Sequence, residues 1–277
     1  MWGIFVLGHD CGHGSFSLNP TLNFVCGTIL HSAILVPYVP WKLTHHHHHK
    51  NTGHIDNDEI FMPIRLNTTK NAVYYVVTSL TGKLPLILTP WFVYLLLGFP
   101  TKNAILYHLN PWSSAKFAGH RFAILLSHTG LVAIGYLLYR WGDTEGFLAV
   151  ALLYLVPLVI FGLWLTVTTF LHHNEAGKVK WFSDKRWSYV KGNLSSIDRS
   201  FGRLFDNLTH NIGTHQVHHL FPIIPHYHLA EATQAFRRAF PHLVNKSERR
   251  ILSVFHQNIH HYRANMKVDD HVDALIM

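Results

Sequence analysis

The chain has few cysteines and few acidic residues for its length. Its 277 residues include only two cysteines, Cys11 and Cys26, too few for a disulfide framework or a thiolate metal site. The 15 acidic residues are outnumbered by 25 histidines. This composition argues against a disulfide-stabilised domain and against a thiolate zinc or iron–sulfur protein. It leaves imidazole as the abundant metal ligand.

The sequence also shows no signal-peptide pattern and no internal repeat of solenoid length. Residues 1–8 are apolar, but they carry no basic leader and run directly into a polar histidine motif. We therefore expect Met1 to be an internal methionine within a helix. We also expect the chain to be missing its first membrane-spanning segments.

Hydrophobic residues gather in long runs, each near or above the roughly 20 residues that cross a hydrocarbon core. The third and fourth runs flank a short polar segment, 140–145, and predict a transmembrane hairpin. Glycine, proline and polar residues interrupt the first two runs, which favours re-entrant or interfacial helices. The four runs are 22–41, 72–99, 122–139 and 147–171.

Positive charge is concentrated after the last run. The formal net charge is +8, and 14 of the 23 lysines and arginines follow Leu171. By the positive-inside rule we expect this segment to be cytosolic, where basic residues also meet anionic headgroups. No basic stripe with interleaved aromatics stands apart from the membrane runs, so nucleic acid is not an expected partner.

Histidines form three clusters at helical spacing. The first is a pair at i and i+4, and the other two are triplets at i, i+3 and i+4, so each cluster lies on one face of a helix. The five consecutive histidines at 45–49 lie deep inside the chain, unlike a purification tag. The clustered residues are His9 and His13; His45, His48 and His49; and His215, His218 and His219.

Eight clustered imidazoles exceed the needs of one metal ion. A zinc ion takes about four ligands and has no redox chemistry, so we expect two redox-active ions that use O2 to attack an unactivated C–H bond. Ligand number favours iron, although ligand type alone leaves copper open. His172 and His173 end the last apolar run, and His173 is the better candidate for a further ligand.

Metal-bound histidines usually donate their second N–H to a carboxylate, a carbonyl or water. Four residues near the clusters are candidates for this supporting role. They are Asp10, His54, Asp58 and His210.

The boxes GHDCGHGSFS (8–17), HHHHHKNTGHIDNDE (45–59) and HNIGTHQVHHLFPIIPHYHLAEAT (210–233) resemble those of membrane fatty acyl desaturases. The spacing H-x3-H, H-x2-HH, H-x2-HH is highly specific. The segment RWSYVKGNLSSIDRSFG (186–202) resembles the methyl-end branch, which makes Δ12 and ω3 double bonds. The resemblance covers nearly the whole chain and is closest to an invertebrate or other eukaryotic member.

The resemblance implies an all-α integral membrane helical bundle with a cytosolic histidine-rich cap over a di-metal site. It implies one desaturase domain over residues 1–277, located in the endoplasmic reticulum with its histidine boxes facing the cytosol. Carried over by position, the iron ligands are His9, His13, His45, His48, His49, His173, His215, His218 and His219.

The implied function is O2-dependent insertion of a cis double bond into a fatty acyl lipid, carried as phospholipid or acyl-CoA, by two iron ions. The chain shows no fused haem-binding domain, so the implied electron donor is a separate cytochrome b5 with its reductase. Two alternatives stay open. One is a hydroxylase, conjugase or acetylenase on the same scaffold, and the other is a non-catalytic membrane protein that binds or transports metal.

Overall fold

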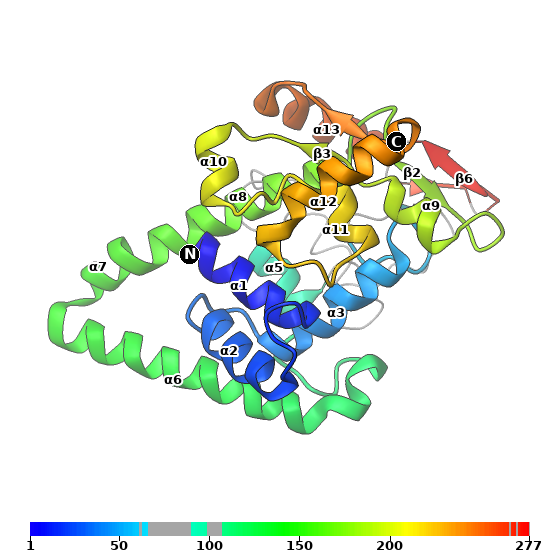
Figure 1. Ribbon diagram of the computed structural model, residues 1–277. Coiled ribbons are helices and arrows are strands. Elements are labelled where there is room, and N and C mark those ends of the chain that lie inside the picture. The colour runs from blue at the N-terminus through cyan, green and yellow to red at the C-terminus, as the bar shows by residue number, and fades with distance from the viewer. Residues whose placement is uncertain (61–62, 66–89, 99–106, 266, 270, 277) are drawn as a thin grey trace. The chain divides into compact units, whose positions relative to one another are not determined.

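The chain forms two compact units in the computed structural model, which describes residues 1–60, 63–65, 90–98, 107–265, 267–269 and 271–276 (Figure 1). Unit 1 comprises Met1–His45 with Lys70–Thr166, and unit 2 comprises His46–Thr69 with Val167–Met277. Most described residues are helical, which confirms the predicted all-α class. The prediction of a single domain over the whole chain stays a prediction.

Unit 1 is built from helices in the part of the chain that the structure describes. Helix α3 continues from unit 1 into unit 2 after His45, and α8 does so after Thr166. The elements are α1 (Trp2–His13), α2 (Pro20–Ser32), α3 (Tyr38–Asn51), α5 (Pro90–Leu97), the 3-10 helix η1 (Ala115–His120), α6 (Arg121–Glu145), α7 (Phe147–Val150), the π-helical turn η2 (Ala151–Leu155) and α8 (Val156–His173).

The two interrupted apolar runs form short helices where they are described. Run 22–41 divides between α2 and α3, and the break at 33–37 contains Leu35 at φ 54°. Of run 72–99, residues 72–89 and 99 lie outside the described residues, and the remainder includes α5. The predicted interruption of the first run is therefore confirmed.

The predicted hairpin is present in unit 1. Ala115–Glu145 and Phe147–His173 are the two segments, among the described residues, that are long and apolar enough to span a membrane. The chain reverses at Gly146, whose φ of 91° suits glycine, and Figure 1 shows α6 and α7 meeting there. The turn predicted at 140–145 was wrong, because those polar residues continue α6 up to Glu145.

The hairpin exposes apolar side chains rather than burying them. Only 11% of the most apolar window of Ala115–Glu145 is buried, and 28% of that of Phe147–His173. Phe122, Val132 and Leu148 are among the large apolar residues exposed on it. Core helices of soluble proteins bury such residues, so this surface fits contact with lipid and the predicted membrane bundle.

Close packing of α1 on α2 fixes the first histidine box in unit 1, and Figure 1 shows the two helices side by side. A Cβ atom added at Gly8 would lie 2.1 Å from the His31 ring, so only glycine allows this approach. The Nε2 atom of His31 lies 3.2 Å from the Phe5 carbonyl oxygen. The ring of Phe5 packs on Trp41 and Phe161, with centroids 5.5 Å apart in each case.

Unit 2 combines short helices with three pairs of very short strands. Its helices, after the end of α3 and of α8, are α9 (Tyr189–Leu194), α10 (Arg203–Leu208), α11 (His215–Leu220), α12 (His226–Ala239), the 3-10 helix η3 (Pro241–Leu243) and α13 (Ile251–Asn265). The strands are β1 (Ile64–Arg65), β2 (Lys180–Phe182), β3 (Asp198–Arg199), β4 (Lys246–Ser247), β5 (Lys267–Val268) and β6 (Ala274–Ile276).

The strand pairs were not predicted from the sequence. Strand β2 pairs antiparallel with β6, whereas β1 pairs with β5 and β3 pairs with β4 in parallel. Each strand has two or three residues, too few for an alternating pattern to stand out. The pairs join distant segments of unit 2 without changing its helical character.

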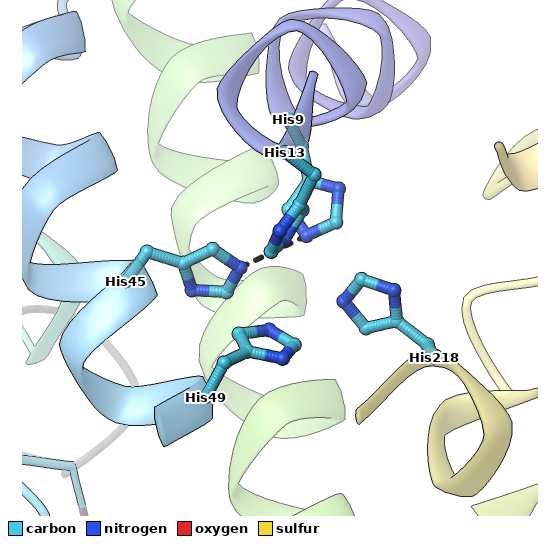
Figure 2. A group of neighbouring side chains, drawn as sticks. All are labelled: His9, His13, His45, His49 and His218. Atoms are coloured by element: carbon cyan, nitrogen blue, oxygen red, sulfur yellow. Dashed lines mark hydrogen bonds between the residues drawn. The ribbon is translucent and has the colours of Figure 1, made fainter. Parts of the chain in front are cut away.

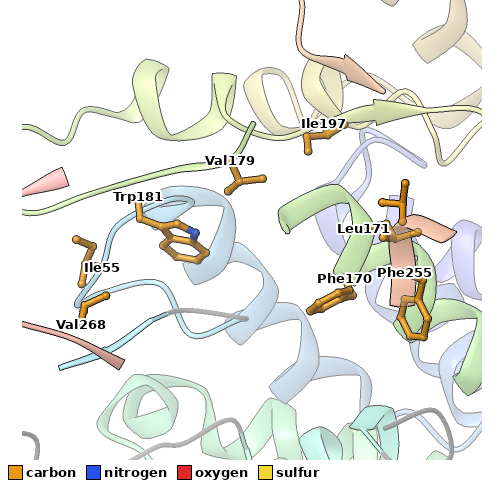
Figure 3. Close-up of a cluster of buried hydrophobic side chains, with 9 residues drawn as sticks. Ile55, Phe170, Leu171, Val179, Trp181, Ile197, Phe255 and Val268 are labelled. Atoms are coloured by element: carbon orange, nitrogen blue, oxygen red, sulfur yellow. The ribbon is translucent and has the colours of Figure 1, made fainter. Parts of the chain in front are cut away.

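A cluster of buried apolar side chains forms the core of unit 2 (Figure 3). Trp181, which is 1% exposed, belongs to this cluster together with Ile55 and Val268 from distant segments. Phe170 and Leu171, on the last turn of α8, belong to it as well. This packing holds the end of α8, and with it His173, within unit 2.

Replacing Trp181 with alanine should destabilise unit 2 by about 3–5 kcal/mol, because it removes a large buried side chain and leaves a cavity. Thermal unfolding of the detergent-purified protein measures the effect. The control is Leu252→Ala, where the side chain is 82% exposed. Equal melting temperatures for the two variants would contradict the proposed core.

Candidate metal centre

All three histidine boxes lie on helices, as their spacing predicts. The first box ends α1, which stops at Gly14 in the left-handed conformation (φ 77°). The second occupies the last two turns of α3, and the third forms most of α11. All eight clustered histidines are buried or half-buried, because each helix turns its histidine face inward.

The unit 1 cluster consists of His9, His13 and His45. Their ligand-capable nitrogens lie within 4.8 Å of one another. The Nε2 atoms of His9 and His45 are 3.0 Å apart, and Figure 2 shows the rings of the three residues turned toward one another. Trp41, one helical turn before His45, stacks on its ring at a centroid distance of 4.7 Å. Packing thus fixes the orientation of His45.

The unit 2 cluster consists of His48, His173, His215 and His219. The Nε2 atom of His173 lies 3.4 Å from that of His48 and 2.9 Å from that of His215. The Nε2 atoms of His215 and His219 are also 2.9 Å apart. Four side chains from α3, α8 and α11 therefore form a run of close Nε2 contacts. The ligand-capable nitrogens of His48, His173 and His219 all lie within 4.8 Å of one another.

These separations fit imidazoles that share a metal ion. With metal–nitrogen bonds of about 2.1 Å, two ligands lie about 3.0 Å apart at a right angle and about 3.4 Å apart at the tetrahedral angle. The observed Nε2 separations of 2.9 to 3.4 Å span this range. The geometry is compatible with a metal site, and the donor set is imidazole nitrogen.

His49 and His218 form a further contact in unit 2. Their ring centroids lie 4.7 Å apart, and Figure 2 includes both residues. Their ligand-capable nitrogens come within 4.8 Å of each other. The ring of His49 also stacks on that of His219 at 4.1 Å. All nine predicted ligands are thus near another predicted ligand of their own unit.

Burial keeps two imidazoles of the unit 2 cluster, those of His215 and His219, neutral. Desolvation, reinforced by the neighbouring histidines, holds the pKa values of His215 and His219 well below the ordinary value of 6.5. A neutral imidazole has one ring nitrogen with a free lone pair, which is the form that binds a metal.

Of the predicted supporting residues, Asp58 contacts a predicted ligand directly. Its Oδ1 accepts the Nδ1–H of His48 at 2.7 Å, and both side chains are buried. The two oxygens also accept the backbone N–H groups of Ile60 and Gly53, each at 3.1 Å. Asp58 therefore directs the Nε2 lone pair of His48 toward His173.

The other three supporting candidates make different contacts. Asp10 Oδ1 is 3.8 Å from His9 Nδ1, too far for a hydrogen bond. The Nε2–H of His54 donates to Asp184 at 2.8 Å, while the His54 carbonyl accepts the N–H of Asp58. The ring of His210 packs against that of His226 at 4.7 Å. His54 thus supports Asp58 rather than a ligand.

Asp198 was missed by the sequence analysis although it supports α11. Its Oδ1 accepts the backbone N–H of Gln216, and its Oδ2 accepts a bond from Arg237 at 2.7 Å. Burial raises the pKa of Asp198, and the Arg237 guanidinium opposes that rise. No local pattern announces this role, because β3 precedes α11 by more than a dozen residues.

These observations define a protein with histidine-built, metal-compatible clusters and an apolar helical hairpin that fits a membrane. Comparison with known sequences narrows this class. The sequence model of the fatty acid desaturase family matches residues 1–247, and the chain belongs to that family.

The most similar relatives include plant omega-3 desaturases. The chain is 45% identical over 236 residues to an Arabidopsis thaliana acyl-lipid omega-3 desaturase (cytochrome b5) of the endoplasmic reticulum, covering 84% of this chain and 60% of that protein. It is 44% identical over 235 residues to a Nicotiana tabacum omega-3 fatty acid desaturase of the endoplasmic reticulum, covering 84% and 61%.

A chloroplastic sn-2 acyl-lipid omega-3 desaturase (ferredoxin) of Arabidopsis thaliana is 43% identical over 239 residues, covering 84% and 52%. The chain therefore spans between 52% and 61% of the length of these relatives. The predicted family and its methyl-end branch are confirmed. The closer prediction of an invertebrate member stays a prediction.

Asp58→Asn should weaken metal binding about 10- to 100-fold, the usual cost of losing a partner that orients a ligand. Both carboxylate oxygens of Asp58 accept hydrogen bonds, whereas an asparagine amide has only one acceptor oxygen. Its NH2 group would therefore face the N–H of either Gly53 or His48, and two donors would oppose each other. Competition between the protein and an Fe(II) chelator measures the affinity. The control is the exposed Asp56→Asn, and equal affinities for the two variants would refute the role of Asp58.

Proposed function

We propose that this protein is a membrane acyl-lipid desaturase that inserts a cis double bond at the methyl end of an unsaturated acyl chain. The observation that carries this proposal is the set of buried imidazoles with Nε2 separations of 2.9 to 3.4 Å in a desaturase-family chain. The names of the similar relatives favour the ω3 position over Δ12.

The proposed metal ligands are the nine histidines predicted from the sequence. The unit 1 cluster would hold one iron ion and the unit 2 cluster another, with His49 and His218 as the remaining ligands. Imidazole binds several metals, but iron combines this ligand type with redox chemistry, which zinc lacks. Bound iron would supply the O2-dependent oxidising power needed to remove hydrogen from an unactivated methylene.

The protein's own residues would orient the centre and keep it dry. His48, His173 and His219 are each 5% exposed or less, so water has little access to their nitrogens. Asp58 holds the proton of His48 on the side away from the cluster. Fixed ligands in a dry site need no rearrangement when the reaction begins, which lowers its barrier.

The end of α8 supports a lipid substrate. This apolar helix ends at His173, so one proposed ligand lies at the boundary of a candidate membrane span. A metal held there would meet acyl chains that enter from the membrane rather than from solution. Similar relatives are acyl-lipid desaturases by name, which favours a phospholipid-bound chain over acyl-CoA.

Location and electron donor belong to the same proposal. We place the protein in the endoplasmic reticulum, with the segment after α8 in the cytosol, because 14 of the 23 lysines and arginines follow Leu171. We propose cytochrome b5 with its reductase as the donor. One similar relative carries cytochrome b5 in its name and another carries ferredoxin, so the donor is a point to test.

Expression in yeast supplied with linoleate should yield a new ω3 double bond, detected by mass spectrometry of the fatty acids. His218→Ala should reduce that product at least roughly 100-fold. Loss of a residue that only orients a ligand costs about 10- to 100-fold, and loss of a ligand should cost more. The control is His256→Ala, an exposed residue of α13. Membrane abundance of each variant is measured by immunoblot.

Two outcomes would overturn the proposal. Hydroxylated fatty acids without new double bonds would assign the scaffold to lipid hydroxylation. Full activity of His218→Ala at normal abundance would remove this residue from the centre.

A further inference from the structure

His219 has two buried hydrogen-bond partners on the side away from the unit 2 cluster. Its Nδ1 lies 3.0 Å from the Thr52 hydroxyl oxygen and 3.1 Å from Asn193 Oδ1. All three side chains are at most 1% exposed. Thr52 directly follows α3, and Asn193 lies in α9, so two segments distant from α11 converge on one ring nitrogen.

The other bonds of Asn193 determine which of its atoms faces His219. Its Nδ2 donates to the carbonyl oxygens of Tyr189 at 2.9 Å and of His49 at 3.3 Å. A flipped amide would place its oxygen against those two carbonyl oxygens. The atom next to His219 is therefore Oδ1, which can only accept a hydrogen bond.

Thr52 must accept as well. Its hydroxyl has a single proton, which it donates to the His48 carbonyl oxygen at 2.7 Å. The oxygen then has lone pairs left for His219. With acceptors on both sides, His219 Nδ1 must carry the proton and share it between Thr52 and Asn193.

We infer that Asn193 and Thr52 are positioning residues that fix the Nδ1–H tautomer of His219 and thereby present its Nε2 lone pair to a metal ion. This inference rests on the proposed function, in which His219 is a ligand. The tautomer of a metal-bound histidine is set by the hydrogen bond that the other ring nitrogen makes.

The rest of α9 is anchored as this role requires. Trp187 Nε1 donates to the Thr52 carbonyl at 3.0 Å, and the Tyr189 hydroxyl donates to the His219 carbonyl at 3.0 Å. A Cβ atom added at Gly192 would lie 1.9 Å from the Thr52 carbonyl oxygen, so α9 touches that backbone directly. The segment therefore holds both acceptors in place against α3 and α11.

The fixed tautomer also explains why the cluster fits a cation. His48 and His219 both carry their proton on Nδ1, so both Nε2 atoms are acceptors. The close contacts run from His48 to His173, then to His215 and His219. Along these three contacts, donor and acceptor Nε2 atoms cannot alternate when both end atoms are acceptors. A shared metal ion removes the conflict between facing lone pairs.

The test is binding of Co(II), followed by its visible absorption in the purified, metal-depleted protein. Thr52→Val and Asn193→Leu each leave one acceptor, so each should weaken binding by less than about 10-fold. The double variant leaves none and should weaken binding about 10- to 100-fold. The matched control is the double variant Thr209→Val with Asn258→Leu. The buried Thr209 hydroxyl donates to the carbonyl four residues earlier, as that of Thr52 does, and Asn258 is another buried amide of unit 2.

A second pair of variants separates hydrogen bonding from packing. In the Asn193→Leu background, Thr52→Ser keeps the hydroxyl but loses a methyl group, whereas Thr52→Val keeps the shape but loses the hydroxyl. We expect the serine variant to bind Co(II) as well as Asn193→Leu alone, and better than the valine variant. If packing were the role, valine would bind better, and the inference would be overturned.

The variant His219→Ala distinguishes failure of this inference from failure of the proposed function. Wild-type Co(II) binding by His219→Ala would contradict the assignment of His219 as a ligand, and with it the inference. If His219→Ala loses Co(II) while Thr52→Val/Asn193→Leu binds it as the control double variant does, the inference alone is wrong.

Discussion

Proton placement among crowded imidazoles is the constraint on which the unit 2 cluster depends. Its Nε2 atoms approach to 2.9 Å, within hydrogen-bond distance, yet the outer sides of His48 and His219 face acceptors that hold both protons on Nδ1. The lone pairs therefore turn inward, where only a cation can satisfy them all. In the proposed centre, Asp58, Thr52 and Asn193 would therefore matter as much as the histidine ligands.

This constraint accounts for the architecture of unit 2. The Nε2 lone pairs of the cluster can be held close together only if the backbone around them is rigid. In the described part of unit 2, buried polar contacts rather than long helices supply that rigidity. Asp198 holds the start of α11, while the apolar core around Trp181 holds the end of α8. A centre built in this way would be preorganised, as the proposed oxidation of an otherwise unreactive acyl chain in a dry environment requires.

The sequence predicted the features that are local. Helical spacing alone placed each histidine box on one helix face, and the length of the apolar runs predicted the hairpin. The position of its turn was wrong because the polar residues before Gly146 suit a helix as well as a loop, and only the glycine has the positive φ of a reversal. Short strand pairs left no pattern to detect.

Supporting contacts were predicted less well, because they depend on tertiary structure. Asp58 lies close to His48 in sequence and was among the candidates, whereas Asn193 reaches His219 from α9 and has no signature in the chain. His54 also lies close to the second box in sequence, but it holds Asp184 and the backbone of Asp58 instead of a predicted ligand. Proximity in sequence is therefore a guide to such partners only within a turn or two of helix.

The central claim is that histidine nitrogens hold a pair of iron ions. Iron K-edge X-ray absorption of the purified protein, combined with metal quantification, tests it directly. We expect about two iron ions per chain, each with nitrogen and oxygen neighbours at about 2.1 Å and the multiple scattering typical of imidazole. Stoichiometric zinc without iron, or iron with sulfur neighbours, would contradict the account.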